Sequence, residues 1–84
     1  MERGEIKPDF FRVTFYIGYE PTEIRYFKTL ENAREYAKKL IKDLKEIAKT
    51  SDDYDWIEIT DEELNTIESW RAEEGKVVHY PNGW

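Results

Sequence analysis

One long amphipathic segment, residues 29–50, most constrains what this 84-residue chain can fold into. Its apolar side chains recur at spacings of three and four residues, which is the period of an α-helix. They are Leu30, Ala33, Ala37, Leu40, Ile41, Leu44, Ile47 and Ala48. At about 100° per residue they fill an arc roughly 120° wide, as expected of a helix that packs on a core. The sequence therefore predicts one helix whose buried face needs a partner surface.

The ends of this helix carry the expected capping and charge signals. The Thr29 hydroxyl can accept a hydrogen bond from a backbone N–H of the first turn. Glu31 lies near the predicted N-terminus and Lys49 near the C-terminus, where the helix dipole favours each charge. The run 51–53 (Ser-Asp-Asp) interrupts the apolar pattern, so we expect the helix to end near Thr50.

The remaining segments are typical of β-strands. Phe11–Ile17 alternates apolar and polar residues with a period of two, and four further runs are rich in strand-forming residues. The predicted strands are residues 11–17, 23–28, 54–60, 66–71 and 76–80. We therefore predict an α+β fold (β-β-α-β-β-β), a five-stranded, mostly antiparallel sheet with one long helix packed on one face.

The connections of this sheet are short and polar. We interpret 18–22 as a connection, and 61–65 as a polar turn or one short helical turn. Residues 73–75 (Glu-Glu-Gly) fit a type I turn closed by a left-handed glycine.

The chain is long enough for one domain, which we place at residues 1–84. Residues 1–9 are expected to form a loose N-terminal lead, and residues 81–84 a C-terminal tail. The sequence has no cysteine and no apolar run near the ~20 residues of a membrane span. These features favour a reducing, cytoplasmic location.

No motif in the sequence points to catalysis, a cofactor or a metal. His79 is the single histidine and lies in a predicted strand, so no base is paired with an activated nucleophile. Residues 52–63 are acidic and have the length of a calcium-binding loop. That loop needs oxygen ligands at its third and fifth positions and glycine at the sixth, where this stretch has Tyr54, Trp56 and Ile57. We therefore expect a non-enzymatic protein without catalytic, cofactor-binding or metal-binding residues.

The charge is unevenly distributed along the chain. The formal net charge is −6, yet residues 1–50 hold 11 basic and 9 acidic groups. Residues 51–75 hold 10 acidic groups and a single arginine. Such asymmetry predicts a surface of two signs, although excess acid also serves solubility alone.

The predicted helix also carries a basic stripe beside its apolar arc. It consists of Arg34, Lys38, Lys42, Lys45 and Lys49. Phosphate groups are bound by stripes of this kind, so a nucleic-acid or ribonucleoprotein accessory role is an alternative. The negative net charge and the neighbouring acids of the helix oppose it, and direct nucleic-acid binding is therefore not the favoured reading.

One helix covers only one face of a sheet, so aromatic and acidic side chains are expected on the other. We place Tyr16, Trp56, Trp70 and Tyr80 there, with Val77 and His79 as the alternative to Tyr80. The face could bind a basic partner protein, close a homodimer, or stabilise the sheet through cross-strand stacking alone. The candidate partner-binding residues are Trp56, Glu58, Asp61, Glu62, Glu63, Glu68, Trp70, Glu73 and Glu74.

In size, acidity, absence of cysteine and one-helix architecture, the chain resembles small virus-encoded inhibitors such as anti-CRISPR and anti-restriction proteins. The resemblance is compositional and carries no family motif, so it assigns no residue a role. It implies a viral, acidic nucleic-acid mimic that acts in the host cell cytoplasm. Our leading hypothesis is accordingly a protein-binding module that blocks a basic, nucleic-acid-binding surface of its partner.

Overall fold

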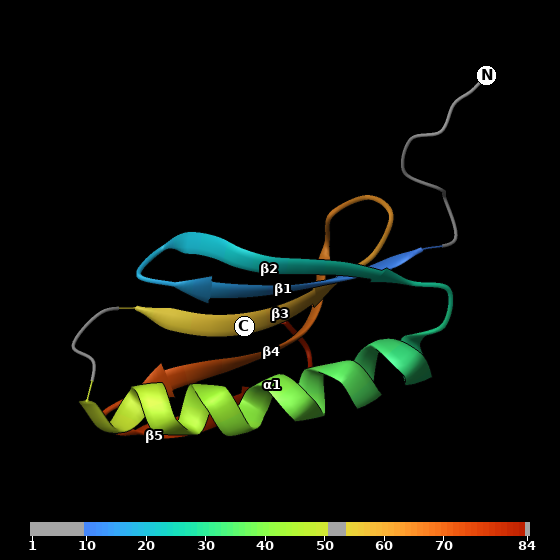
Figure 1. Ribbon diagram of the computed structural model, residues 1–84. Coiled ribbons are helices and arrows are strands. Elements are labelled where there is room, and N and C mark those ends of the chain that lie inside the picture. The colour runs from blue at the N-terminus through green and yellow to red at the C-terminus, as the bar shows by residue number, and fades with distance from the viewer. Residues whose placement is uncertain (1–9, 51–53, 84) are drawn as a thin grey trace.

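The described part of the chain forms one five-stranded sheet with a single helix along one side (Figure 1). The computed structural model describes residues 10–50 and 54–83, so the expected N-terminal lead lies outside the described part. The elements are β1 (Phe11–Ile17), β2 (Glu20–Phe27), α1 (Leu30–Thr50), β3 (Asp55–Thr60), β4 (Thr66–Glu73) and β5 (Lys76–Tyr80). The predicted α+β fold and its order of elements are confirmed.

The strand order in the sheet is β2-β1-β3-β4-β5, and every neighbouring pair is antiparallel. β2 and β3 run in the same direction, because each is antiparallel to β1, which lies between them. α1 connects these two strands. β1, β3 and β4 are interior strands and hold the sheet's fully buried side chains, whereas β2 and β5 form the two edges.

α1 begins as the sequence predicts and buries its alanine and leucine face. The Thr29 hydroxyl accepts a hydrogen bond from the backbone N–H of Asn32 at 3.1 Å. This bond satisfies one of the donors that a helix N-terminus leaves open. The buried helix residues pack against the interior strands, and the resulting core is Val13, Phe15, Ala33, Ala37, Leu40, Leu44, Ile57, Ile59 and Trp70.

Two tight hairpin turns differ from the sequence-based expectation. Gly18 and Tyr19 join β1 to β2 with φ of 60° and 72°, and β2 therefore begins at Glu20, earlier than predicted. Glu74 and Gly75 join β4 to β5 with φ of 53° and 83°. Positive φ at both central residues defines a type I′ turn, whose twist matches that of the strands. The expected type I turn at 73–75 is therefore wrong.

The faces of β4 also differ from the prediction, which placed Glu68 and Trp70 beside Trp56. In the structure Trp70 lies opposite Ile57 and Glu68 opposite Ile59, so both side chains project to the helix-covered face. The pairing slips between Ile59 and Thr60, which leaves Ile67 as an extra residue. In a regular strand, Ile67 and Trp70 would project to opposite faces, because they are three positions apart. The bulge allows Ile67 to pack against the same core as Trp70.

The described part of the predicted C-terminal tail is held against β4. The Ser69 hydroxyl, which is fully buried, donates a hydrogen bond to the carbonyl of Gly83. Gly83 has φ of 109°, and a Cβ at this position would lie 3.0 Å from the Thr66 carbonyl oxygen. Only glycine accommodates both the backbone conformation and this close approach.

Leu44 lies at the centre of the helix–sheet contact with none of its surface exposed. We expect Leu44→Ala to lower the free energy of unfolding by about 2–5 kcal/mol, because it leaves a cavity as well as losing burial. Urea denaturation followed by circular dichroism measures this change. The neighbouring Lys45→Ala, on the exposed side of α1, should change it by less than about 0.5 kcal/mol.

Candidate partner-binding face

The face of the sheet opposite α1 is organised around the carboxylate of Glu58. The Tyr16 hydroxyl donates to Glu58 Oε2 at 3.2 Å, and the Trp56 indole Nε1 donates to Oε1 at 3.2 Å. The two rings stack with centroids 4.3 Å apart and planes inclined by 14°. Burial, and then the nearby Glu58 carboxylate, raise the pKa of the Tyr16 phenol above its ordinary value. Glu58 therefore fixes the two rings in place, and only 9% of its own surface is exposed.

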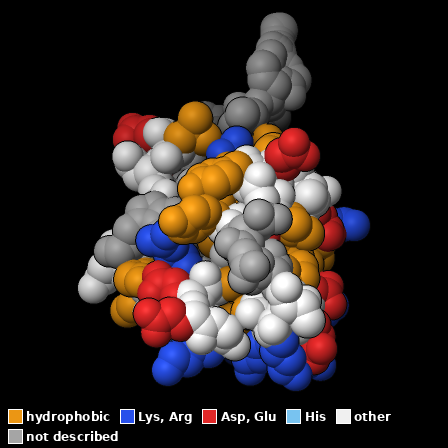
Figure 2. Space-filling view, turned by 90° about the vertical axis from the view of Figure 1, so that its left-hand side faces the viewer, with side chains coloured by type: hydrophobic (Ala, Val, Ile, Leu, Met, Phe, Trp, Pro, Cys, Tyr) orange, Lys and Arg blue, Asp and Glu red, His pale blue; other side chains and the backbone are white. Residues whose placement is uncertain are grey.

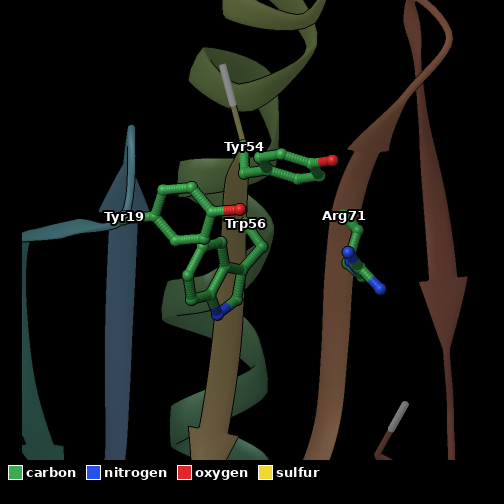
Figure 3. A pocket seen from close by; sticks show the side chains of 4 residues that line it. All are labelled: Tyr19, Tyr54, Trp56 and Arg71. Carbon is green, nitrogen blue, oxygen red and sulfur yellow. The ribbon is translucent and has the colours of Figure 1, made fainter.

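Beside this centre, Tyr19, Tyr54, Trp56 and Arg71 line an open cavity of about 330 Å³ (Figure 3). The Tyr19 ring lies 5.1 Å from that of Tyr54 and meets Trp56 edge-on at 6.0 Å. Tyr19 and Tyr54 are 64% and 55% exposed, large fractions for tyrosines that adjoin one another. We call these four residues the aromatic corner.

The turn that carries Tyr19 is fixed by contacts with the start of β3. The backbone N–H of Gly18 donates to Asp55 Oδ1 at 2.9 Å, and that of Tyr19 donates to the Tyr54 carbonyl at 3.3 Å. The positive φ of Tyr19 is uncommon for a residue other than glycine, asparagine or aspartate. These contacts hold the strained tyrosine against Tyr54 and Trp56.

Figure 2 views the molecule from the end at which this turn lies. Hydrophobic side chains reach the surface there, with both acidic and basic side chains around them. Arg71, on β4, lies across the cavity from Tyr54, and its Nε lies 3.7 Å from a carboxylate oxygen of Glu73. The Glu73 carboxylate also accepts a hydrogen bond from the Tyr80 hydroxyl at 2.6 Å, which together with burial raises the pKa of Tyr80.

The predicted acidic residues form two separate groups. Asp61, Glu62 and Glu63 lie in the turn between β3 and β4, which is a turn without a helical segment. Glu73 and Glu74 lie at the β4–β5 turn, at the other end of the sheet. The structure therefore brings Trp56, Glu58 and Glu73 to the open face but does not join all the carboxylates into one strip.

Asp61 organises its own turn. Its Oδ1 accepts hydrogen bonds at 2.9 Å from the backbone N–H groups of Glu63 and Asn65. These bonds, with that from Asn65 the larger cause, hold the pKa of Asp61 below its ordinary value. They also hold the left-handed Leu64, whose φ is 67°. Asp61 has a local structural role that the sequence pattern did not indicate.

Two predicted site residues, Glu68 and Trp70, belong to the helix side instead. Glu68 is 6% exposed, and its Oε1 lies 2.8 Å from Arg34 Nε. Its Oε2 lies 2.5 Å from His79 Nε2, and the His79 ring stacks on Trp70 with centroids 5.1 Å apart. Trp70 is 8% exposed. These contacts tie α1, β4 and β5 together and leave neither residue available as a surface anchor.

The basic stripe of α1 is partly neutralised by nearby acids. Arg34 pairs with Glu68, as described above. Lys38 lies 3.7 Å from Glu35, and Lys49 lies 3.5 Å from Glu46. Lys42 and Lys45 are exposed on the same helix. Three of the five cations therefore have an acidic neighbour, which weakens the attraction of the stripe for a polyanion.

Sequence reasoning missed Tyr19, Tyr54 and Arg71 as parts of a common surface. Tyr54 lies just before β3 and two positions before Trp56, so the period of two already places it on the Trp56 side, but it is absent from the candidate partner-binding residues. Tyr19 follows Gly18 in the segment 18–22, which the sequence predicts to be a connection between strands. Arg71 reaches the open face because the side chains of β4 project to the opposite faces from those predicted.

The comparisons with known proteins give no relative. No protein family matches the chain, and neither a curated protein nor a solved structure matches it.

Within residues 10–50 and 54–83, no group of three or more His, Cys, Asp or Glu side chains is arranged to hold a metal ion. In the same ranges, the helix is not apolar enough over its length to cross a membrane.

Replacing Glu58 tests whether it supports the open face. We expect Glu58→Ala to lower the free energy of unfolding by about 1–3 kcal/mol, because the Tyr16 and Trp56 donors both lose their acceptor. Urea denaturation measures the change. Glu62→Ala removes an exposed carboxylate from the β3–β4 turn and should change stability by less than about 0.5 kcal/mol. Equal effects of the two substitutions would contradict the role given to Glu58.

The lowered pKa of Asp61 predicts a pH-dependent contribution to stability. A carboxyl whose pKa is lower in the folded state stabilises the fold above its ordinary pKa of 3.8, and this contribution is lost as pH falls through the folded-state value. Asp61→Asn should therefore be less stable than the wild type at neutral pH, and the difference should shrink in strong acid. Thermal melts of both proteins across this range provide the measurement. A constant difference at every pH would argue against the ionised side chain as its source.

Proposed function

We propose that this protein is a small, non-enzymatic protein-binding module that docks on a basic surface of its partner through the open face of the sheet. The observation that carries the proposal is the aromatic corner, in which two tyrosines more than half exposed adjoin Trp56 on the face that α1 does not cover. Interface hot spots are enriched in tyrosine, tryptophan and arginine, and all three types line this cavity.

The chemistry of the partner follows from charge and from the rings. The protein carries a net charge of −6, which attracts and orients a cationic partner over a distance. Aromatic faces also attract lysine and arginine side chains through cation–π contacts. Glu73 and Glu74 lie at the same end of the sheet and can pair with further cations of that surface. Tyr19, Tyr54 and Trp56 would anchor the complex, and the carboxylates would steer it.

The proposal includes an inhibitory action. A partner whose basic surface binds nucleic acid would be blocked while the module covers that surface, as an anti-restriction type of inhibitor would do. The two groups of acids do not form one continuous phosphate-like strip, so recognition rests on the aromatic corner, with the net charge assisting. A cytoplasmic location, in the host cell if the chain is virus-encoded, belongs to the same proposal.

Affinity capture with matched baits tests the proposal. The baits are the wild type, Tyr54→Ala in the aromatic corner, and Leu64→Ala in the β3–β4 turn, where a leucine is 58% exposed. We expect basic proteins to be retained by the wild type and by Leu64→Ala, and about tenfold less by Tyr54→Ala. Quantitative mass spectrometry of the eluates measures retention.

Salt provides the second readout of the same experiment. Raising the ionic strength from about 0.01 M to about 0.15 M shortens the Debye length from about 30 Å to about 8 Å and should release the captured proteins. Retention of basic proteins that is the same at both ionic strengths, or that is unchanged by Tyr54→Ala, would refute the proposal. A shift of random DNA or RNA by the wild type in a gel would instead favour the stripe on α1.

A further inference from the structure

β2 is an edge strand of unusual composition and exposure. Within residues 10–50 and 54–83 it pairs with β1 alone, so its outer side presents backbone N–H and C=O groups to solvent. Ile24 and Tyr26 on this strand are 46% and 44% exposed. An exposed edge with apolar side chains is a template on which another strand can pair. Its eight residues also make it longer than β5, which has five.

The charges of this edge are arranged with opposite signs about Ile24. Glu20 and Glu23 precede it, and Arg25 and Lys28 follow it. Glu20 and Lys28 each lie four positions from Ile24, and Glu23 and Arg25 each lie one position from it. At each of these distances from Ile24, the residue before it is acidic and the residue after it is basic.

This arrangement matches an antiparallel pairing of β2 with a second copy of itself. When Ile24 faces Ile24 of the partner copy, Glu23 faces Arg25, and this pair occurs twice by symmetry. Glu20 and Lys28 lie outside the regular part of the pair, because β2 is bulged at Thr22 and ends at Phe27. Opposite charges directly across an antiparallel pair are stabilising, and like charges are destabilising. This register thus gives Glu23 and Arg25, the charged residues of the regular part of β2, a partner of opposite sign.

Registers shifted by one or two residues lose this complementarity. A shift of the second copy by one residue in either direction removes the Glu23–Arg25 pairs. A shift by two residues places Glu23 opposite Glu23, or Arg25 opposite Arg25. The other edge strand, β5, carries Lys76 as its only Lys, Arg, Asp or Glu, so pairing β5 with itself forms no opposite-charge pair.

We propose that the protein forms a homodimer through antiparallel pairing of two β2 strands centred on Ile24. The two sheets then join into one continuous sheet, since an isologous interface repeats each contact about a two-fold axis. With that axis perpendicular to the sheet, both helices lie on one face and both aromatic corners on the other. The inference is independent of the proposed function, because it uses the outer side of β2, whereas Tyr54, Trp56 and Arg71 of the aromatic corner lie at β3 and β4; Tyr19 alone adjoins β2, at the turn before Glu20.

Local contacts of the charged pair are compatible with the dimer. Arg25 Nε lies 3.7 Å from a Glu23 carboxylate oxygen of the same strand, and the Arg25 guanidinium lies 5.3 Å from the centre of the Tyr36 ring. The Arg25 and Glu23 side chains are 62% and 39% exposed. The weak internal pair leaves both groups able to contact the second copy, where four charges would form one cluster.

Charge reversal tests the register. Glu23→Arg places arginine opposite arginine across the two-fold axis, and Arg25→Glu places glutamate opposite glutamate. We expect either change to raise the dimer dissociation constant at least about tenfold, and the double swap of both residues to restore it. Sedimentation equilibrium from the micromolar to the millimolar range measures the constant, and thermal melts confirm that each variant is folded. Glu35→Arg on the exposed side of α1 is the matched control and should leave the constant unchanged.

Cysteine cross-linking tests the geometry in the same range of concentrations, since the chain has no cysteine of its own. In the proposed register, the two Cα atoms of position 24 lie about 4.5–5.5 Å apart, within the range a disulfide spans. Ile24→Cys should therefore form a covalent dimer on mild oxidation. Glu20→Cys on the same strand should not, because its two copies lie about 26 Å apart along the pair.

The outcomes separate clearly. A concentration-dependent mass that the single reversals abolish and the double swap restores supports the dimer, as does cross-linking at position 24 and not at position 20. A wild type that remains monomeric at millimolar concentration overturns it. A dimer whose dissociation constant is unchanged by the charge reversals also overturns it, because that dimer would form through another surface, such as the open face.

Discussion

The described structure depends on one constraint, that α1 alone must form the second layer over a five-stranded sheet. The apolar arc of α1 covers the side chains of the interior strands on one face, and residues such as Val13, Ile57 and Ile59 become fully buried there. No helix in residues 10–50 and 54–83 covers the opposite face. It must therefore be stabilised by its own side chains, and this requirement determines what those side chains are.

The open face meets this requirement with a polar centre and stacked rings. Glu58 accepts hydrogen bonds from Tyr16 and Trp56, so a carboxylate on an interior strand has partners for both of its oxygens. Ring stacking then covers part of the sheet that would otherwise face water. Tyr19 and Tyr54 extend this layer beyond the sheet itself. Stability thus accounts for Tyr16 and Glu58, whereas the exposure of the two outer tyrosines supports a role in recognition.

The sequence allowed the helix, the five strands and the α+β class to be predicted, because each has a local cause. Thr29 caps α1, and the period of two in 11–17 marks β1. The faces of β4 could not be predicted, since they depend on a bulge at Ile67 that only the pairing with β3 reveals. That one extra residue moves Glu68 and Trp70 from the open face to the helix-covered face. It also places Arg71 on the open face, beside Trp56. The positive φ of Tyr19 and the separation of the acids depend likewise on contacts between distant parts of the chain.

The position of α1 in the chain order has a consequence for how the molecule reaches this structure. The hairpins β1–β2 and β4–β5 close through two-residue turns, so their strands meet after very short loops. The pairing of β1 with β3 joins Arg12 to Thr60 and Ile17 to Asp55, and every residue of the helix lies between them. Closing so long a loop costs chain entropy before the contacts are gained, which slows folding relative to local pairing. We therefore expect the pairing of β1 with β3, where the N-terminal and C-terminal halves meet, to be the slowest step of folding.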